Sequence, residues 1–369
     1  MLVRYGKTKD GAAVKRAEIY TKEEHPIRRQ DIDPDAVSII LRLKAAGHTA
    51  YVVGGAVRDL LVGKVPKDFD IATDAHPRKI KRLFRNSRII GKRFRLVHVY
   101  FGSKIIEVST FRSLHGMGEM NQYGAIHEDV QRRDFSLNAL YYCPVEEIII
   151  DYVGGVKDIR NKVVRPIIPL KQIFVEDPVR MVRAVKYSAM LGFSLPFFTR
   201  RLIQKQAPLL AGCSYSRLTE ELFKILGSGA SAVTLKALHS LKLLRHFLPS
   251  LDLRLQENRN DFYDRFFQTL ERYDGSEPEL EERAKGLAAL LKDHLEDLKR
   301  EQGDVPLLFK DFYAAAKEFF RPLSPPNRDV DKAVMMIFRE THPKKPRRRR
   351  RRKPKGETPD AKTAETVPV

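Results

Sequence analysis

Cysteine, long apolar runs and a hydrophobic leader are all scarce or missing from this 369-residue sequence. Only Cys143 and Cys213 are present, too few for a disulfide framework or a cysteine-based zinc site. No segment approaches the roughly 18 apolar residues that a membrane span needs, and residues 1–30 lack the apolar core of a signal peptide. We therefore expect a cytoplasmic protein with no membrane partner.

Acidic residues are also too few to balance the basic ones. The chain has 68 Lys and Arg against 47 Asp and Glu, for a formal net charge of +21. Such an excess predicts a polyanionic partner, and RNA, DNA or an anionic membrane surface would all fit. Residues 344–355 contribute ten basic side chains with no acidic one. We expect this segment to be disordered and to bind RNA backbone through its arginines, namely Arg347, Arg348, Arg349, Arg350, Arg351 and Arg352.

The spacing of apolar residues predicts an α+β protein, with a mixed α/β head followed by helices only. The head contains predicted helices at 36–46, 56–62 and 77–84, strands at 49–53, 68–71, 96–101 and 105–111, and a long loop at 112–130. Later helices are predicted at 179–191, 217–226 and 230–248. The predicted organisation is a basic N-terminal arm (1–30) that is mobile or poorly packed, a catalytic head (31–166), a helical neck (167–227), a helical RNA-binding body and tail (228–340), and a disordered basic tail (341–369).

Two carboxylates in the predicted strand 68–71 form the first candidate site. Side chains alternate along a strand, so Asp68 and Asp70 would share one face while Phe69 and Ile71 enter the core. Two carboxylates on one face can hold a divalent metal ion, of which Mg²⁺ is the expected one and Mn²⁺ the alternative. A pair of solvated acids at a strand end would give the same pattern.

A glycine pair lies just upstream of these acids. Gly54 and Gly55 stand where a strand turns into a helix, and Arg58 follows one turn later. Backbone N–H groups at such a turn can hold a phosphate. The glycine turn and the carboxylates together would therefore grip a nucleoside triphosphate.

Four segments occur in the following order: GGAVRDLLVG with DFD (54–63 and 68–70), RRDFSLNA (132–139), DYVGG (151–155) and EDPVRMVRA (176–184). Together they resemble the motifs of the class II RNA nucleotidyltransferases, a family of the DNA polymerase beta superfamily that contains bacterial poly(A) polymerases and CCA-adding tRNA enzymes. The resemblance covers roughly residues 36–227.

The resemblance implies a template-independent nucleotidyltransferase that uses two metal ions to extend RNA 3′ ends, with ATP as substrate. Asp68 and Asp70 would bridge the metals, which bind both the attacking hydroxyl and the triphosphate. A third carboxylate is expected, and the sequence offers Glu107 or Asp151. Strand geometry favours Glu107, and we keep Asp151 as the alternative.

The second motif would contact the nucleotide through its sugar and phosphates. Asp134 and Asn138 are four residues apart, so a helix would place both on one face, where they can bond ribose hydroxyls. Arg132 and Arg133 are the expected phosphate partners. A helix start capped by Asp134 and flanked by solvated arginines is the alternative interpretation.

The last motif would read the base. Asp177 can accept a hydrogen bond from the adenine amino group while Arg180 donates to the adjacent ring nitrogen, and helical spacing would set them side by side. Glu176 and Arg183 would steady the pair through ion pairs. Cytosine presents the same donor and acceptor, so this pair rejects G and U without separating ATP from CTP.

Residues 83–99 resemble a segment of bacterial poly(A) polymerases and include Lys92, Arg93 and Arg95 as candidate RNA contacts. We therefore predict a polynucleotide adenylyltransferase, which acts as a monomer or with RNA-processing proteins. A CCA-adding or A-adding tRNA enzyme is the alternative within the family. A catalytically inactive RNA-binding protein is the alternative from another class, although the presence of both Asp68 and Asp70 argues against it. A bifunctional tRNA-repair enzyme with a phosphohydrolase domain is disfavoured because no His-Asp dipeptide occurs.

Overall fold

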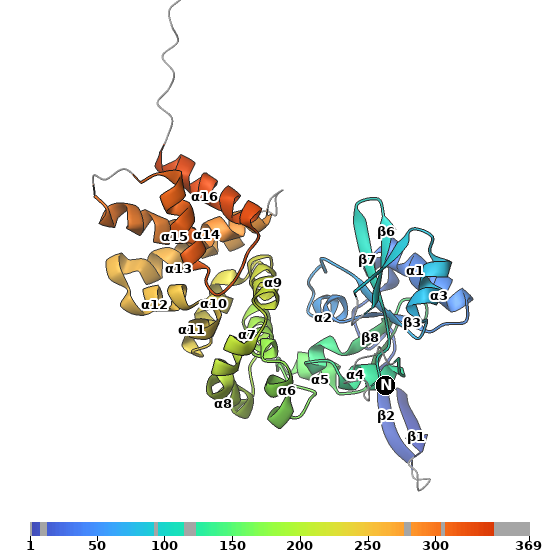
Figure 1. The fold of residues 1–369 in the computed structure, drawn as a ribbon. Coiled ribbons are helices and arrows are strands. Elements are labelled where there is room, and N and C mark those ends of the chain that lie inside the picture. Colours follow the sequence, from blue (N-terminus) through green and yellow to red (C-terminus); the bar gives the residue numbers. More distant parts are fainter. Residues whose placement is uncertain are drawn as a thin grey trace, which may run out of the picture.

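A nine-stranded sheet with helices around it forms one half of the molecule and a stack of helices forms the other (Figure 1). The structure is a computed structural model that describes residues 2–7, 13–91, 95–113, 123–276, 282–303 and 307–342. The strands are β1 (Leu2–Lys7), β2 (Ala13–Tyr20), β3 (Ala50–Val53), β4 (Asp70–Thr73), β5 (Ser87–Ile90), β6 (Leu96–Phe101), β7 (Lys104–Thr110), β8 (Leu140–Cys143) and β9 (Ile148–Asp151). They pair in the order β1-β2-β9-β8-β3-β4-β7-β6-β5, and only β4 and β7 among these neighbours run parallel.

The helices of the head pack on this sheet because their apolar residues lie on one side. In α1, for example, Ile39, Ile40 and Leu43 are fully buried in the core that also contains β3 and β4. The helix begins at Pro34 behind an Asp33 cap and is followed by Gly47, whose φ of +82° favours glycine. The head helices are α1 (Pro34–Ala45), α2 (Gly55–Leu61), α3 (Pro77–Leu83), α4 (Ile126–Gln131) and α5 (Gly155–Arg160), with short 3₁₀ turns η1 (Arg29–Asp31) and η2 (Ser136–Asn138).

The predicted mobile arm at residues 1–30 is wrong for the part that the structure describes. Strand β2 pairs with β9, so the hairpin of β1 and β2 extends the sheet of the head. Ala17 and Tyr20 are buried, and η1 lies between β2 and α1. Scattered charge obscured a strand whose partner is about 130 residues away in the sequence.

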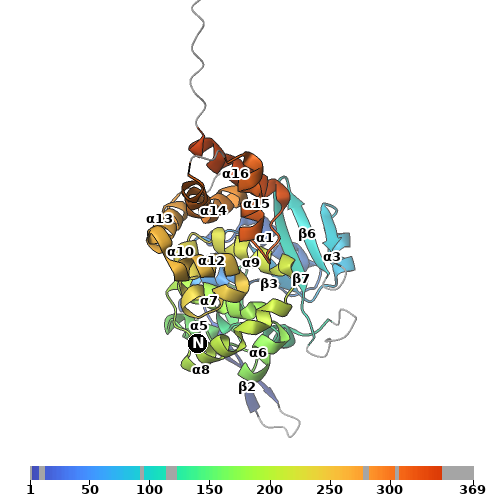
Figure 2. The ribbon, with the colours of Figure 1, turned by 60° about the vertical axis from the view of Figure 1, so that its left-hand side comes forward.

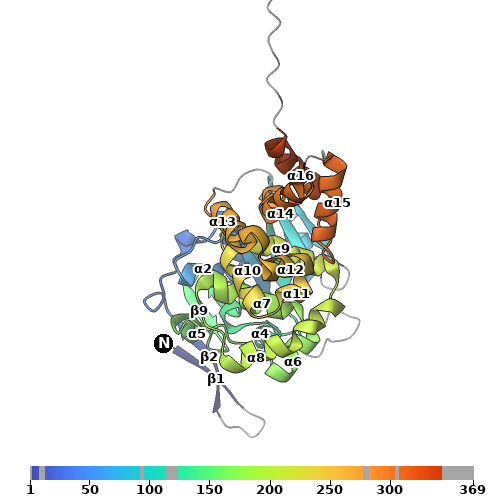
Figure 3. The same cartoon turned by 90° about the vertical axis from the view of Figure 1, so that its left-hand side faces the viewer.

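The second half of the described chain is helical after residue 170, as predicted. Its elements are α6 (Leu170–Glu176), α7 (Val179–Leu191), α8 (Phe197–Gln206), η3 (Ala207–Gly212), α9 (Tyr215–Leu226), α10 (Ser231–Ser240), α11 (Leu244–Phe247), α12 (Pro249–Glu257), η4 (Arg259–Asp261), α13 (Phe262–Asp274), α14 (Glu282–Glu301), α15 (Phe309–Phe319) and α16 (Asn327–Thr341). Helices α14 to α16 lie together at one end of this stack, and α6 and α8 lie at the other (Figure 2). Seen from the helical side, α7, α10 and α12 lie in front of the head (Figure 3).

Two predicted elements differ in detail. The helix expected at 230–248 is divided into α10 and α11, because Lys242 adopts a positive φ of 61° and ends the first helix. The long loop expected at 112–130 contains α4 at its end, while residues 114–122 lie outside the described residues. Within the described ranges, no helix is both long and apolar enough to cross a membrane.

Polar contacts join the head to the helices along the segment between α2 and β4. Lys64 Nζ donates to the Met190 carbonyl oxygen of α7 at 3.1 Å, and Lys67 Nζ donates to the Gly227 carbonyl oxygen after α9 at 2.5 Å. Arg183 of α7 forms an ion pair with Asp134 of the head at 2.8 Å. These contacts hold the neck against the head. The candidate site lies between the sheet and the neck.

Candidate active site

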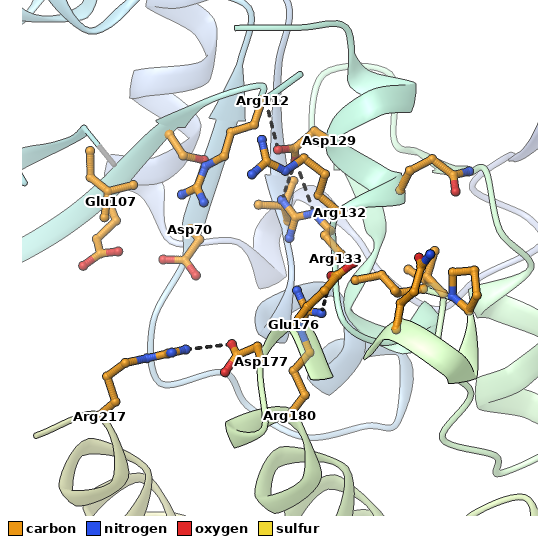
Figure 4. Close-up of a pocket in the computed structure, with 18 residues that line it drawn as sticks. Asp70, Glu107, Arg112, Asp129, Arg132, Arg133, Glu176, Asp177, Arg180 and Arg217 are labelled. Carbon is orange, nitrogen blue, oxygen red and sulfur yellow. Dashed lines mark hydrogen bonds and ion pairs between the residues drawn. The ribbon is translucent and has the colours of Figure 1, made fainter. Parts of the chain in front are cut away.

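A cleft of about 1290 Å³ opens between strands β3, β4, β6 and β7 of the sheet and the helices α6, α7 and α9 (Figure 4). An adjoining cavity of about 610 Å³ continues from it toward the glycine turn. Both are lined by residues from the head and from the neck, which are far apart in sequence. The residues common to both are Asp70, Arg132, Arg133, Asp177 and Arg180.

Asp70 and Glu107 reach into the same part of the cleft because their strands are neighbours. Asp70 is the first residue of β4, which pairs in parallel with β7 so that Ile71 lies opposite Val108. The preceding residues, Asp70 and Glu107, are therefore adjacent across the pair, and Figure 4 shows both carboxylates on one side of the cleft. Glu107 is about half exposed, and His98 Nε2 lies 3.2 Å from one of its oxygens.

Asp68 is placed differently from the prediction. It lies two residues ahead of β4, outside the strand, so alternation within one strand does not position it. It lines the adjoining cavity together with Asp70, whereas Glu107 lines the larger cleft. Asp70 lines both cavities, so it lies between Asp68 in the smaller cavity and Glu107 in the larger cleft.

The electrostatics of Asp70 fit a cation site. Reduced hydration in the cleft walls, and then the neighbouring charges of Glu107 and Asp68, raise the pKa of Asp70 to about 6, although Arg133 and Lys224 oppose the shift. The carboxylate still reaches solvent through the open cleft. No three acidic, histidine or cysteine side chains among the described residues form a complete ligand set. Oxygen donors that repel one another suit a hard divalent ion with further ligands from substrate.

The glycine turn has the backbone shape that the sequence suggested. Gly54 has φ +73° and ψ −130°, a conformation that side chains disfavour, and α2 begins at Gly55. A Cβ at Gly55 would lie 3.4 Å from Arg58 Nη2. Arg58 is buried, donates to Asn138 Oδ1 at 2.8 Å and lies 4.9 Å from the Tyr187 ring centre. This arginine therefore connects the turn to both the second motif and the neck while lining the cavity.

The second motif is compact without being an α-helix. Asp134 lies in a bend before the 3₁₀ turn η2 and Asn138 ends that turn, so the predicted helical face is wrong. The two side chains nevertheless meet, because Asn138 Nδ2 donates to Asp134 Oδ1 at 3.3 Å. Both are buried at the cavity wall, and Arg183 pairs with Asp134.

The two arginines of this motif have different surroundings. Arg132 Nη1 donates to the Ser113 carbonyl oxygen at 2.5 Å. Arg133 Nη2 lies 3.0 Å from Asp129 Oδ2, and Arg133 Nε donates to Tyr141 Oη at 3.0 Å. Both line the two cavities, so their positive charge faces the cleft from positions held by backbone or buried side chains.

The base-reading pair is not built as predicted. Helix α6 ends at Glu176, Asp177 is extended, and α7 starts at Val179 after Pro178, so Asp177 and Arg180 do not share a helix. Arg180 pairs with Glu176 at 3.1 Å. Asp177 instead accepts a hydrogen bond of 2.7 Å from Arg217 of α9 (Figure 4). Pro178 therefore separates Asp177 from Arg180. Each of the two pairs with another side chain, and both line the cleft.

Asp151, the alternative third carboxylate, does not line either cavity. Its side chain is 1% exposed at the start of α5. One oxygen accepts the backbone N–H groups of Val153, Gly154 and Gly155 at 2.8 to 3.0 Å, and the other accepts that of Val156 at 2.9 Å. This carboxylate caps a helix, and Glu107 is the third acidic side chain that the structure brings to Asp70.

Of the predicted RNA contacts, only Arg95 lies among the described residues, where it is exposed just before β6. Lys92, Arg93 and the arginines 347–352 lie outside them. Several cleft residues had no motif to indicate them. Arg217 and Lys224 come from α9, where Glu221 pairs with the buried Lys186 of α7 at 2.8 Å, and α9 was predicted only from its amphipathic spacing.

Comparisons with known proteins agree with this architecture. Residues 50–165 match the family model described as poly A polymerase head domain, and residues 192–255 match the one described as probable RNA and SrmB-binding site of polymerase A. The chain is 41% identical over 266 residues to poly(A) polymerase I of Escherichia coli O157:H7, which covers 68% of this chain and 57% of the relative. The chain thus spans less than two thirds of that relative's length.

Two further similarities concern CCA-adding enzymes. The enzyme of Bacillus subtilis is 37% identical over 214 residues, which is 56% of this chain and 54% of that protein. The crystal structure of the Bacillus stearothermophilus CCA-adding enzyme in complex with CTP superposes with a TM-score of 0.57 at 28% identity, covering 84% of this chain and 83% of that one. The order of head and helices is thus common to both kinds of relative.

Proposed function

This chain belongs to the RNA nucleotidyltransferase family that bacterial poly(A) polymerases share with CCA-adding enzymes, and from this premise we propose that it transfers AMP from ATP to RNA 3′ ends. The observation that carries the proposal is the acidic pair of Asp70 and Glu107 in a cleft that Asp177 and Arg180 also line, next to a cavity that contains the glycine turn.

The two cavities suggest how the reactants divide. The smaller one, with Gly54, Gly55 and Arg58, would take the triphosphate, and the larger one, with Glu107 and Arg132, would take the last nucleotides of the primer. Asp70 lines both cavities, so it would lie next to both the triphosphate and the end of the primer. Mg²⁺ or Mn²⁺ bound at Asp70, with Asp68 and Glu107 nearby and further oxygen ligands from the substrates, would supply charge stabilisation for in-line attack of the primer hydroxyl.

The charges around the cleft would orient the substrates before reaction. Arg132 and Arg133 are held by Ser113 and Asp129, so they can bind phosphate oxygens without first being ordered. Buried Asn138 and Asp134 lie where a ribose would meet the cavity wall. Each of these groups would position substrate, while the α-phosphorus of ATP forms a bond to the primer 3′ oxygen and its bond to the pyrophosphate oxygen breaks.

Base choice would rest on two separately held polar groups. Asp177 can accept from an exocyclic amine while Arg217 fixes its carboxylate, and Arg180 can donate to a ring nitrogen while Glu176 fixes its guanidinium. Adenine and cytosine satisfy both groups, whereas guanine and uracil oppose them. GTP and UTP should therefore be rejected. Any preference for ATP over CTP must come from the size of the pocket, so we expect CTP to be a poor substrate that is not excluded.

The helices would hold RNA, since residues 192–255 match an RNA-binding family model. The resemblance to poly(A) polymerase I favours RNA polyadenylation. We propose that the protein acts in the cytoplasm as a monomer, with RNA-processing proteins as further partners. Addition of CCA or A to tRNA is the second candidate, favoured by the CCA-adding relatives.

The decisive experiment supplies purified protein and Mg²⁺ with a generic RNA and, separately, with tRNA lacking its 3′ end. ATP, CTP or both are added, and the products are resolved by length. Poly(A) synthesis predicts long heterogeneous tails on both RNAs with ATP, and none with Asp70→Ala. A product limited to two C and one A on truncated tRNA would overturn the poly(A) assignment and keep the site. RNA binding without any addition would leave only the inactive RNA-binding protein.

A further inference from the structure

Helix α8 presents an exposed aromatic and basic face. The side chains of Phe197 and Phe198 are 65% and 73% exposed, although phenylalanine is normally buried. Their rings meet edge to face at 5.5 Å between centroids. The opposite side of the helix packs into the core through Ile203 and Thr199, so the two rings point away from the protein.

Basic side chains continue this face along the helix. Arg201 follows Phe197 by four residues and Lys205 follows Arg201 by four, so they lie one above the other. Arg200 borders them, and all three are exposed. None of the ion pairs found in the described part of the chain involves these three residues. We call these five residues, Phe197, Phe198, Arg200, Arg201 and Lys205, the α8 ridge.

The exposed charge of the ridge has one sign. Residues 178–219 contain seven Lys and Arg and not one Asp or Glu. Four of the seven lie off the ridge and pair with acids of other segments, namely Arg180, Arg183, Lys186 and Arg217. No such pair is found among the described residues for the three on α8. A protein partner that used only the two rings would not require this bias, whereas a nucleic acid strand carries a negative charge at every nucleotide. Exposed rings beside unpaired cations match the requirements of single-stranded nucleic acid, whose bases stack on aromatics while its phosphates meet the cations.

Helix α8 lies where single-stranded RNA that leads to the cleft could pass. Helix α8 packs against α6, and Gln172 and Glu176 of α6 line the cleft. Figures 1 and 3 both show α8 and α6 side by side at the same end of the helical stack. RNA that leaves the cleft over α6 would therefore reach the ridge next.

We propose that the α8 ridge is a stacking platform for single-stranded RNA upstream of the 3′ end. This deepens the proposed function, on which it rests, by naming a place where the RNA is held outside the catalytic cleft. The bases of the upstream strand stack on Phe197 and Phe198, and its phosphates bind Arg200, Arg201 and Lys205. Stacking does not read sequence, which suits an enzyme that extends many RNAs.

The absence of tryptophan from the chain allows a direct test. In the full-length Phe198→Trp variant the ridge carries the sole indole, and we titrate it with oligoadenylate of roughly 15 nucleotides without ATP. We expect strong fluorescence quenching that saturates with the same Kd as RNA anisotropy. The matched control is Leu308→Trp, an exposed apolar position just before α15 and outside residues 192–255, where we expect no quenching. An unquenched indole at 198 under RNA saturation would refute the platform.

Substitution separates stacking from general apolar contact. Phe197→Leu with Phe198→Leu keeps an apolar surface but removes the rings, and we expect the Kd for oligoadenylate to rise about tenfold. Tyrosine at both positions should restore binding. Replacing the three cations with glutamine should reduce the slope of log Kd against log salt by ~2. Unchanged affinity in the leucine variant would instead indicate a protein partner and overturn the proposal.

The stacking platform and the proposed adenylyltransferase activity can be refuted independently of each other. A primer too short to extend from the cleft beyond α6 should be elongated by the leucine variant as fast as by the wild type. Lack of elongation by the wild type would contradict the adenylyltransferase assignment, while indole quenching by RNA would still support the platform. Slower elongation of that short primer by the leucine variant would contradict the position of the ridge outside the cleft.

Discussion

Exchanging Glu107 and Asp151 for their amides should separate catalysis from folding. Asp151 is buried, and its carboxylate accepts four backbone N–H groups at the start of α5. In Asp151→Asn one oxygen remains, but an amide N–H₂ then faces the donating N–H of Val156. An unsatisfied buried N–H costs about 1–3 kcal/mol, and loss of the charge at the helix start costs up to about 1 kcal/mol. We therefore expect Asp151→Asn to lower the free energy of unfolding by ~2–4 kcal/mol.

Glu107→Gln should have the opposite profile. This side chain is half exposed and its contact with His98 is at the surface, so the stability change should stay within ~0.5 kcal/mol. Its carboxylate faces Asp70, so the rate of AMP addition should fall by at least ~10²-fold, about 3 kcal/mol of transition-state stabilisation.

Urea unfolding and single-turnover extension of a short primer measure the two effects. Glu271→Gln, a similarly exposed acid on α13 that pairs with Lys236, is the matched control and should change neither. The assignment of the third carboxylate is refuted if Glu107→Gln keeps its rate while Asp151→Asn loses activity with unchanged unfolding.

Three further predictions concern the cleft. The pKa of Asp70 is raised to about 6 in the folded protein, above its value in the unfolded chain. The protonated carboxyl therefore stabilises the metal-free fold below about pH 4, and this stabilisation is lost as the pH rises through 6. Asp70→Asn should therefore stabilise the metal-free protein at pH 7 by ~1 kcal/mol after screening in the open cleft, as measured by thermal unfolding. The same variant should abolish AMP addition. Equal stability of the variant and the wild type at pH 7 would contradict this prediction. Arg217→Ala releases the Asp177 carboxylate and should raise KM for ATP about tenfold with a smaller change in kcat, and an unchanged KM in steady-state kinetics would count against it. Arg180→Ala should narrow the preference for ATP over GTP at least ~10-fold in competition assays, and preserved selectivity would show that another group reads the base.

Local patterns predicted the elements that depend on neighbours in the sequence. The apolar spacing of α1, α7 and α9 survives in the fold because a helix buries residues three and four apart whatever it packs against. The glycine turn was equally predictable, since Gly54 needs a positive φ that few other residues adopt. The resemblance of the ordered motifs added the family and the expected chemistry, which composition by itself left open among several polyanion-binding classes.

Tertiary structure decided how the acidic residues are used. Glu107 and Asp151 are both acids on strands, and only the parallel pairing of β4 with β7 brings one of them beside Asp70. Asp151 reaches a helix start instead, where backbone amides occupy its oxygens. Which acid meets a metal and which caps a helix depends on strand order, and strand order is a long-range property.

The same reason explains the base-reading groups and the N-terminal hairpin. Asp177 pairs with Arg217, which is 40 residues away in the sequence, and β2 pairs with β9, which is about 130 residues away. The sequence by itself determined helix periods, turns, charge and family, because these depend on residues close together or on whole composition. Only the fold decided which distant charges meet, because an ion pair or a strand pair forms between surfaces whose approach is set by the packing of everything between them.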